Sequence, residues 1–280
     1  MSPGCGSAAK DQGRGGSSGC EGDGPEIWLI DLEACAGALG AIEAREGLLT
    51  PGDRQRLQAI KNEGVARERM CAVIALRVLM ARVWGSACRG IEIARSAGVA
   101  PFLPGVAGSF SLSHAAGHAL VGITVKGAVG VDLEGLREVM ISPERRGLIL
   151  EAAGHLPVLR ALPAAGGDTQ RFMSSWVRLE ATAKMLGCGI GRLLTDLGII
   201  GPRGGDLLEQ LERVLARVPD LQVADIEERS NGLVGAVAVR GIGFCGRVLR
   251  FPDSVPDIEA LRGAPIAVDR AGQSMRKGAP

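Results

Sequence analysis

Aromatic residues are scarce in this chain of 280 residues, which has no tyrosine, three tryptophans and five phenylalanines. Proteins that bind single-stranded nucleic acid without sequence preference stack the bases on interleaved aromatic rings. The composition therefore argues against that class, and we expect no nucleic-acid partner. The chain also lacks any uninterrupted run of about 18 apolar residues, so we expect no membrane-spanning helix.

Neither the cysteine pattern nor the net charge indicates a particular class of function. The seven cysteines are an odd number and form no Cys-x-x-Cys pair, which argues against a zinc ribbon or a redox dithiol. No basic-then-apolar signal pattern opens the sequence, so we expect a reducing, cytoplasmic location. The formal net charge is +1, and any attraction to an anion must therefore come from local clustering of basic residues.

The hydrophobic pattern predicts an α+β protein. Short apolar runs predict strands, and longer periodic segments predict helices. We expect strands over 27–32, 110–114, 119–125, 128–134, 221–228 and 233–240, and helices over 48–84, 142–152, 169–186 and 206–217. The strands between 110 and 134 predict an antiparallel meander, and the glycine-rich segment 187–191 predicts a turn.

The order of these elements does not alternate strictly, which disfavours a doubly wound parallel sheet. We instead expect two similar α/β halves in a pseudo-twofold arrangement, each a small antiparallel sheet packed with a long helix. Residues 1–24, rich in glycine and serine, predict a disordered tail. The N-terminal half then covers 25–127, the C-terminal half 128–250, and a flexible extension 251–280.

Basic residues concentrate between positions 54 and 95, while residues 96–125 contain no lysine, arginine, aspartate or glutamate. The charge-free segment is expected in the interior. For the basic residues, a solvated helix face and an anion site are about equally good interpretations. His114 ends the predicted strand 110–114, where a lone histidine is more often a core residue than a ligand, although it could donate a hydrogen bond to a phosphate.

Two pairs of charged residues are candidates for chemistry. Asp132 and Glu134 lie two residues apart on a strand, so their side chains project from the same face and could bind a hard cation such as Mg²⁺. The alternative is that the two acids have no ligand and only stand where the strand leaves the core for solvent. Glu180 and Lys184 lie four residues apart on a helix. A surface ion pair and a phosphate-binding constellation are about equally good interpretations of this pair, since the apolar flanks of the helix make unused charges there costly.

Three segments together resemble the signatures of the Sfp-type 4'-phosphopantetheinyl transferases. These are Phe-Ser-Leu-Ser-His at 110–114, Val-Gly-Val-Asp-Leu-Glu at 129–134 and Trp-Val-Arg-Leu-Glu-Ala-Thr-Ala-Lys at 176–184. The resemblance covers about residues 26–245 and includes Thr50-Pro51 and Ala75-Leu76-Arg77. It implies that a monomer transfers the phosphopantetheine group of coenzyme A to a serine of an acyl or peptidyl carrier protein, with Mg²⁺ or Mn²⁺ bound.

The resemblance also implies roles for individual residues. The metal ligands would be Asp132, Glu134 and Glu180, with Glu180 also taking the proton of the acceptor serine and Lys184 neutralising charge on the phosphates. Ser113 and His114 would contact the phosphates of coenzyme A. The candidates for its 3'-phosphate are Arg54, Arg56, Arg69 and Arg77.

The sequence departs from the family at two basic positions. The residue before Glu180 is Leu179 where the family has lysine, and Gly98-Val99-Ala100-Pro101 lacks the lysine of the family's Gly-Lys-Pro. Helical geometry turns Arg178 about 100° away from Leu179, so it is a poor replacement. These losses keep two alternatives open: a weakened relative that binds coenzyme A or a carrier protein without transfer, and an enzyme that uses the same fold for another reaction.

Overall fold

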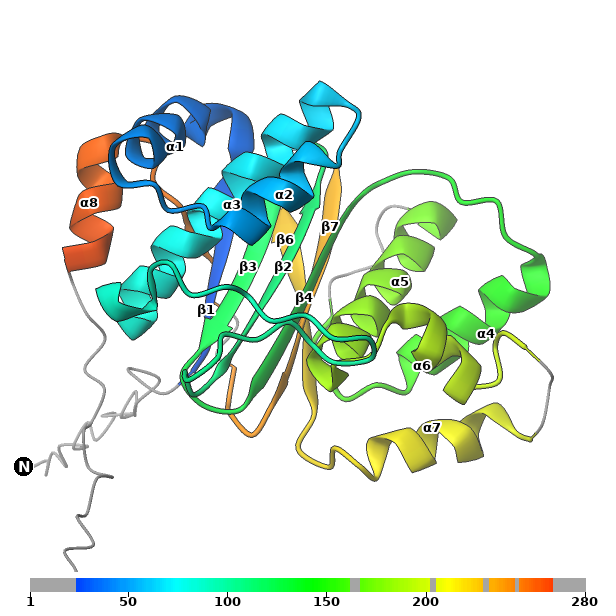
Figure 1. Ribbon diagram of the computed structural model, residues 1–280. Helices are drawn as coiled ribbons and strands as arrows, with labels where there is room; N and C mark the ends of the chain where they lie inside the picture. The colour runs from blue at the N-terminus through cyan, green and yellow to red at the C-terminus, as the bar shows by residue number, and fades with distance from the viewer. Residues whose placement is uncertain (1–23, 162–166, 202–204, 229–231, 245–246, 264–280) are drawn as a thin grey trace, which may run out of the picture.

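The computed structural model describes residues 24–161, 167–201, 205–228, 232–244 and 247–263. The predicted tail, apart from Gly24, and the last part of the predicted extension lie outside these residues. Figure 1 shows strands in the centre of the molecule and helices on two opposite sides. Within the described residues the strands form two four-stranded sheets, so the fold is a mixed α+β fold.

The first sheet belongs mainly to the N-terminal half. Its strand order is β2-β3-β1-β8, in which β1 and β2 run antiparallel to β3 while β8 is parallel to β1. These strands are β1 (Glu26–Asp31), β2 (Ser109–Ala115), β3 (His118–Thr124) and β8 (Leu249–Arg250). The helices around it are α1 (Leu32–Glu46), α2 (Pro51–Gln58), α3 (Glu63–Trp84), a short 3₁₀ turn (Ser86–Cys88) and α8 (Val255–Gly263).

The second sheet has the order β4-β7-β6-β5, with β4 and β6 antiparallel to β7 and β5 parallel to β6. Its strands are β4 (Ala128–Gly135), β5 (Val158–Arg160), β6 (Gln222–Glu228) and β7 (Leu233–Arg240). The helices of this half are α4 (Pro143–Gly154), α5 (Gly167–Leu186), α6 (Ile190–Asp196) and α7 (Leu207–Leu215). The long helix α5 packs on β4 and β7.

The two halves share one connectivity. In each half a strand is followed by a long helix and then by two further strands, in the orders β1-α3-β2-β3 and β4-α5-β6-β7. The last strand of each series lies in the sheet between the other two strands of that series. Similar halves were expected from the sequence. The expected purely antiparallel sheets were wrong, because β8 and β5 each add a short parallel edge strand.

Three local expectations need correction. The helix expected over 48–84 is divided into α2 and α3, because the Asn62 side chain accepts a hydrogen bond from Val65 N and starts a new helix. The expected meander is wrong because β3 is already flanked by β1 and β2, so β4 joins the other sheet. Helix α6 begins inside the segment expected to be a turn, and α1 was not expected at all.

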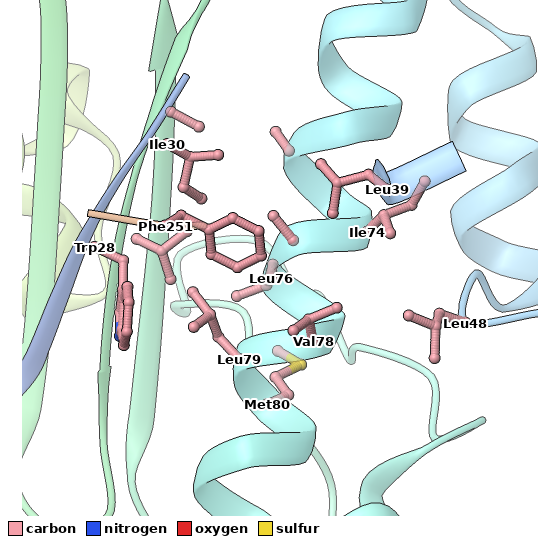
Figure 2. Close-up of a cluster of buried hydrophobic side chains, with 14 of the residues drawn as sticks. Trp28, Ile30, Leu39, Leu48, Ile74, Leu76, Val78, Leu79, Met80 and Phe251 are labelled. Atoms are coloured by element: carbon pink, nitrogen blue, oxygen red, sulfur yellow. The ribbon is translucent and has the colours of Figure 1, made fainter. Parts of the chain in front are cut away.

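The extension expected to be flexible from residue 251 is folded as far as Gly263. Strand β8 pairs with β1, and Phe251 then packs edge-on against Trp28 with ring centroids 6.3 Å apart. Ile258 of α8 is completely buried. Figure 2 shows Trp28 and Phe251 beside Leu76 and Leu79 of α3 in the core of this half. The C-terminal segment thus completes the N-terminal half, because it removes from water apolar surface of β1 and α3 that would otherwise be exposed.

Serine side chains connect the two sheets where the edge strands β2 and β4 lie side by side. Ser109 Oγ accepts a hydrogen bond from Val129 N (2.9 Å), and Ser111 Oγ accepts one from Val131 N (3.1 Å). Because alternate residues of a strand point the same way, Ser113 continues this row towards Asp132. A separate apolar core between the sheets, including Ile27, Val131 and Val237, fixes them against each other.

None of the helices among the described residues combines the length and the hydrophobicity that crossing a bilayer requires.

Candidate functional site

Three carboxylates meet at the end of β4 next to helix α5. Asp132 and Glu134 come from β4 and Glu180 comes from α5, and one oxygen of each lies within 4.8 Å of the others. The spacing of two on the strand places the first two on one face, and Glu180 joins them only through the packing of α5 on β4. This convergence is the arrangement that the sequence predicted.

Gly130 allows the close packing that brings Glu180 to β4. A Cβ atom added at this glycine would lie 2.1 Å from Ala181 O and 2.4 Å from Met185 N. Helix α5 therefore touches the backbone of β4 at a point between Ala181 and Met185. Glu180 and Lys184 precede these two contact residues directly, so a side chain at position 130 would move both away from Asp132.

Asp132 is 2% exposed, and its two carboxylate oxygens differ in their contacts. Oδ1 accepts hydrogen bonds from Lys184 Nζ (2.7 Å) and from Ser113 Oγ (2.8 Å). Oδ2 is buried and has no hydrogen-bond partner among the described residues. A buried carboxylate oxygen without a partner is costly, and an oxygen-only cluster of this size suits Mg²⁺ or Mn²⁺. The residues present therefore fit a divalent cation.

The electrostatics of the cluster are those of crowded, partly desolvated acids. Burial raises the pKa of Asp132, and Lys184 offsets only part of that effect. Burial also raises the pKa of Glu180, with repulsion from Asp132 and Glu134 adding to it and a hydrogen bond from Trp176 opposing it. Glu134 is bonded by Arg137. A cation would offset the burial and the mutual repulsion that raise these two pKa values.

A cavity of about 350 Å³ adjoins the acid cluster, and Lys184 lines it. Its apolar wall includes Val73 and Leu76 of α3 together with Phe110 and Leu112 of β2. Arg69 and Arg95 give it positive charge. The cavity thus combines an apolar surface with cations next to a candidate metal site, as a phosphate-bearing ligand with an apolar part would require.

Only one of the four arginines expected to bind coenzyme A lines this cavity. Arg69 does, from α3. Arg54 pairs with Glu43 and Arg56 with Asp53 on α2. Arg77 is 4% exposed, and it bonds Asp53 Oδ2 (2.6 and 2.9 Å) and Ile91 O (2.7 Å). Its guanidinium is thus occupied by structural partners and does not reach the cavity.

Ser113 and His114 are neighbours on β2, but of the two only Ser113 bonds a residue of the acid cluster. Ser113 donates to Asp132 and so holds a candidate metal ligand, which the sequence did not predict. His114 is half-buried, and burial together with Arg69 and Lys184 lowers its pKa. Its imidazole is therefore neutral at pH 7 and can donate a hydrogen bond without carrying a charge.

The two departures from the family pattern have different surroundings. Leu179 is completely buried in the core of the C-terminal half, so the position faces packed side chains. Arg178 bonds Asp225 on β6 with an Nε–Oδ1 distance of 2.7 Å and points away from the acids, as the helical geometry predicted. Val99 and Ala100, by contrast, line the cavity.

Three features of the site were not predicted, although Ser113 itself was among the predicted residues. The row Ser109, Ser111 and Ser113 has the period of two that marks one face of a strand, and this period was the available signal. Arg95 is the last charged residue before the charge-free segment 96–125, but the expectation that this whole segment is interior is wrong, because residues 96–99, 104–105 and 107–108 are exposed and the chain is mainly buried only from Phe110 on. Trp176 stands four residues before Glu180 on α5, and this helical spacing was the available signal for its effect on the Glu180 carboxylate.

No protein-family model matches this chain, and no curated protein matches it in sequence. What can be said about function therefore rests on the residues and on their geometry.

Proposed function

We propose that this protein is an Mg²⁺-dependent 4'-phosphopantetheinyl transferase that uses coenzyme A and a serine of an acyl or peptidyl carrier protein. One observation carries the proposal. Side chains from three separate segments meet at one place: Ser113 from β2, Asp132 and Glu134 from β4, and Glu180 and Lys184 from α5. These are the segments that resemble the transferase signatures. The matching connectivity of the two halves also supports the two-halved fold of that family.

The residues present suit the proposed reaction. The serine oxygen of the carrier forms a bond to the β-phosphorus of coenzyme A, the bond from this phosphorus to the bridging oxygen breaks, and 3',5'-ADP leaves. Phosphoryl transfer needs mostly positioning and charge neutralisation. A divalent cation bound by Asp132, Glu134 and Glu180 would supply Lewis-acid polarisation of the phosphates.

Glu180 is the residue suited to take the proton of the attacking serine. Its raised pKa makes it a stronger base than an exposed carboxylate. Lys184 lines the cavity and bonds Asp132, so its ammonium lies between the acid cluster and the place of the ligand. There it can neutralise charge on the phosphates and on the departing oxygen.

The decisive experiment is a mass measurement. Purified protein is incubated with coenzyme A, Mg²⁺ and several carrier proteins, and each carrier is expected to gain the mass of one phosphopantetheine group if it is a substrate. Asp132→Ala should abolish the gain, while Glu209→Ala, on the exposed face of α7, should not. No mass gain on any carrier, under conditions where a reference transferase works, would overturn the proposal.

A second candidate is a protein that binds coenzyme A without transferring its arm. The observation that favours it is that Val99 and Ala100 line the cavity without the lysine of the family. It predicts calorimetric binding of coenzyme A together with an unchanged carrier mass, so the same two measurements separate the candidates.

A further inference from the structure

Ser113 belongs to the sheet of the N-terminal half, yet its side chain bonds an acid of the other half. Its backbone is fixed in the β2–β3 ladder, where it pairs with Leu120, and Leu120 is completely buried in the apolar core between the two sheets. Ser113 is itself buried, and its Oγ donates to Asp132 Oδ1 over 2.8 Å. This hydrogen bond therefore joins a fixed strand of one half to a candidate metal ligand of the other.

The hydrogen bond of Ser113 differs from those of the other two serines in the row on β2. Ser109 Oγ and Ser111 Oγ each accept from a backbone N–H of β4 that lies 20 residues further along the chain. Ser113 donates instead, and its partner is a side chain 19 residues further along. An ionised carboxylate only accepts hydrogen bonds, so the single hydroxyl proton of Ser113 is turned towards Asp132. The first two serines thus bond the backbone of β4, whereas the third acts on the acid.

Both hydrogen bonds to the Asp132 carboxylate fall on one of its two oxygens. Oδ1 accepts from Ser113 Oγ and from Lys184 Nζ (2.7 Å), while Oδ2 is buried without a partner among the described residues. One donor comes from β2 and the other from α5, so together they fix the rotation of the carboxylate. This arrangement leaves Oδ2 as the oxygen that is free to bind a cation together with Glu134 and Glu180.

We propose that Ser113 is a positioning residue that orients Asp132 for a divalent cation. Partners that hold a metal ligand in place commonly raise the affinity for the metal by about 10- to 100-fold. The inference rests on the proposed function in that it takes the acid cluster as a cation site. It extends that function because all three acids lie in the C-terminal half, and a residue of the N-terminal half then sets the affinity of their site.

The test is the affinity for Mn²⁺ alone, which depends neither on turnover nor on coenzyme A. Electron paramagnetic resonance follows the titration of the full-length protein with Mn²⁺ and compares wild type with Ser113→Ala and Ser113→Thr. We expect Ser113→Ala to bind Mn²⁺ about tenfold or more weakly than wild type. Ser113→Thr keeps the hydroxyl and should recover most of the affinity. A side chain that served only the phosphates of coenzyme A would leave the Mn²⁺ affinity of Ser113→Ala unchanged.

Ser109→Ala is the matched control, because Ser109 lies on the same strand and bonds β4 through Val129 N rather than through an acid. It loses one hydrogen bond between the sheets and should be less stable in urea, yet it should keep the Mn²⁺ affinity of wild type. Wild-type affinity in Ser113→Ala, an equal loss in Ser109→Ala, or no recovery in Ser113→Thr would overturn the inference.

The positioning role and the proposed transfer can fail separately. If the Mn²⁺ affinity depends on Ser113 but no carrier protein gains mass, the positioning role stands and the transfer fails. If carrier proteins gain mass while Ser113→Ala binds Mn²⁺ like wild type, the transfer stands and the positioning role fails.

Discussion

Lys184 Nζ lies 2.7 Å from Asp132 Oδ1, across 52 residues of sequence, and so connects helix α5 to the buried end of strand β4. The ammonium also lines the cavity beside the acid cluster. One side chain thus serves two neighbours: it compensates a buried carboxylate and presents charge to whatever ligand the cavity holds.

Replacing Lys184 should affect transfer and metal binding in opposite directions. Lys184→Met removes a cation from the cavity, and we expect the transfer rate to fall by about 100-fold, as when one group that stabilises a transition state is lost. The same change leaves Asp132 without its competing cation, so Mn²⁺ binding, followed by electron paramagnetic resonance, should become several-fold tighter. Weaker Mn²⁺ binding in the variant would contradict this role for Lys184.

Divalent cations should stabilise the folded protein through Asp132. A ligand that binds only the folded state at 100 times its dissociation constant adds about 2.7 kcal/mol to the free energy of unfolding. We expect Mg²⁺ to raise the melting temperature of wild type and to leave that of Asp132→Asn unchanged, because the amide cannot act as an anionic ligand. An equal effect of Mg²⁺ on both proteins would place the cation elsewhere.

The raised pKa of Glu180 predicts how stability depends on pH without metal. Because the folded protein disfavours the charged carboxylate, stability is full below the ordinary value of 4.5 and is lost as the pH rises through the higher folded pKa. ¹³C NMR titration of the metal-free protein should place the Glu180 pKa above 4.5. Glu134→Gln should lower it by removing a repelling charge, and a pKa that stays the same or rises would refute the coupling.

Gly130 should tolerate no side chain. An added Cβ would lie 2.1 Å from Ala181 O, and because this is backbone, the helix itself must shift. We expect Gly130→Ala to cost about 3 kcal/mol of unfolding free energy and to reduce Mn²⁺ binding. Gly147→Ala in α4 is the control: nothing lies within 4 Å of its added Cβ, so it should stabilise the protein slightly. Equal stability of both variants in urea denaturation would contradict the close contact.

Restoring the family's lysine at position 179 should not improve the protein. If the missing lysine weakened the protein, Leu179→Lys would raise activity, but Leu179 is completely buried among apolar side chains. An unpaired buried ammonium is expensive, so we expect a loss of about 3 kcal/mol or more in unfolding free energy. Leu179→Met, which conserves volume, should lose less than about 1.5 kcal/mol. A Leu179→Lys protein with wild-type stability and higher transfer activity would show that this interpretation is wrong.

Several parts of the fold followed from local sequence patterns. The strand and helix of the acid cluster were predictable because the apolar run before Asp132 and the long helical pattern around Glu180 are strong signals over short distances. The α+β class and the similar halves followed from the order of such segments. The split between α2 and α3 was missed because helical periodicity continues across it, although Asn62 is a capping residue.

Pairing between distant segments was not predictable in the same way. Strand β4 looked like the third strand of a meander, but long-range burial decided that it pairs with β7. The residues after 250 were expected to be flexible, yet Phe251 and Ile258 pack on the core of the N-terminal half. Composition alone does not reveal that these residues pack on the core. The free energy gained by burying them depends on which apolar surface the rest of the chain leaves exposed.

The sequence by itself determined which acids could form a site: Asp132 and Glu134 on one strand face, and Glu180 with Lys184 on one helix face. It also determined that basic residues gather before residue 96. The tertiary structure decided which of these basic residues reach the cavity, since Arg77 and Arg69 lie on one helix but only Arg69 lines it. The physical reason is that a guanidinium satisfied by a buried carboxylate has no donors left for a ligand, and only the packing of distant segments places that carboxylate.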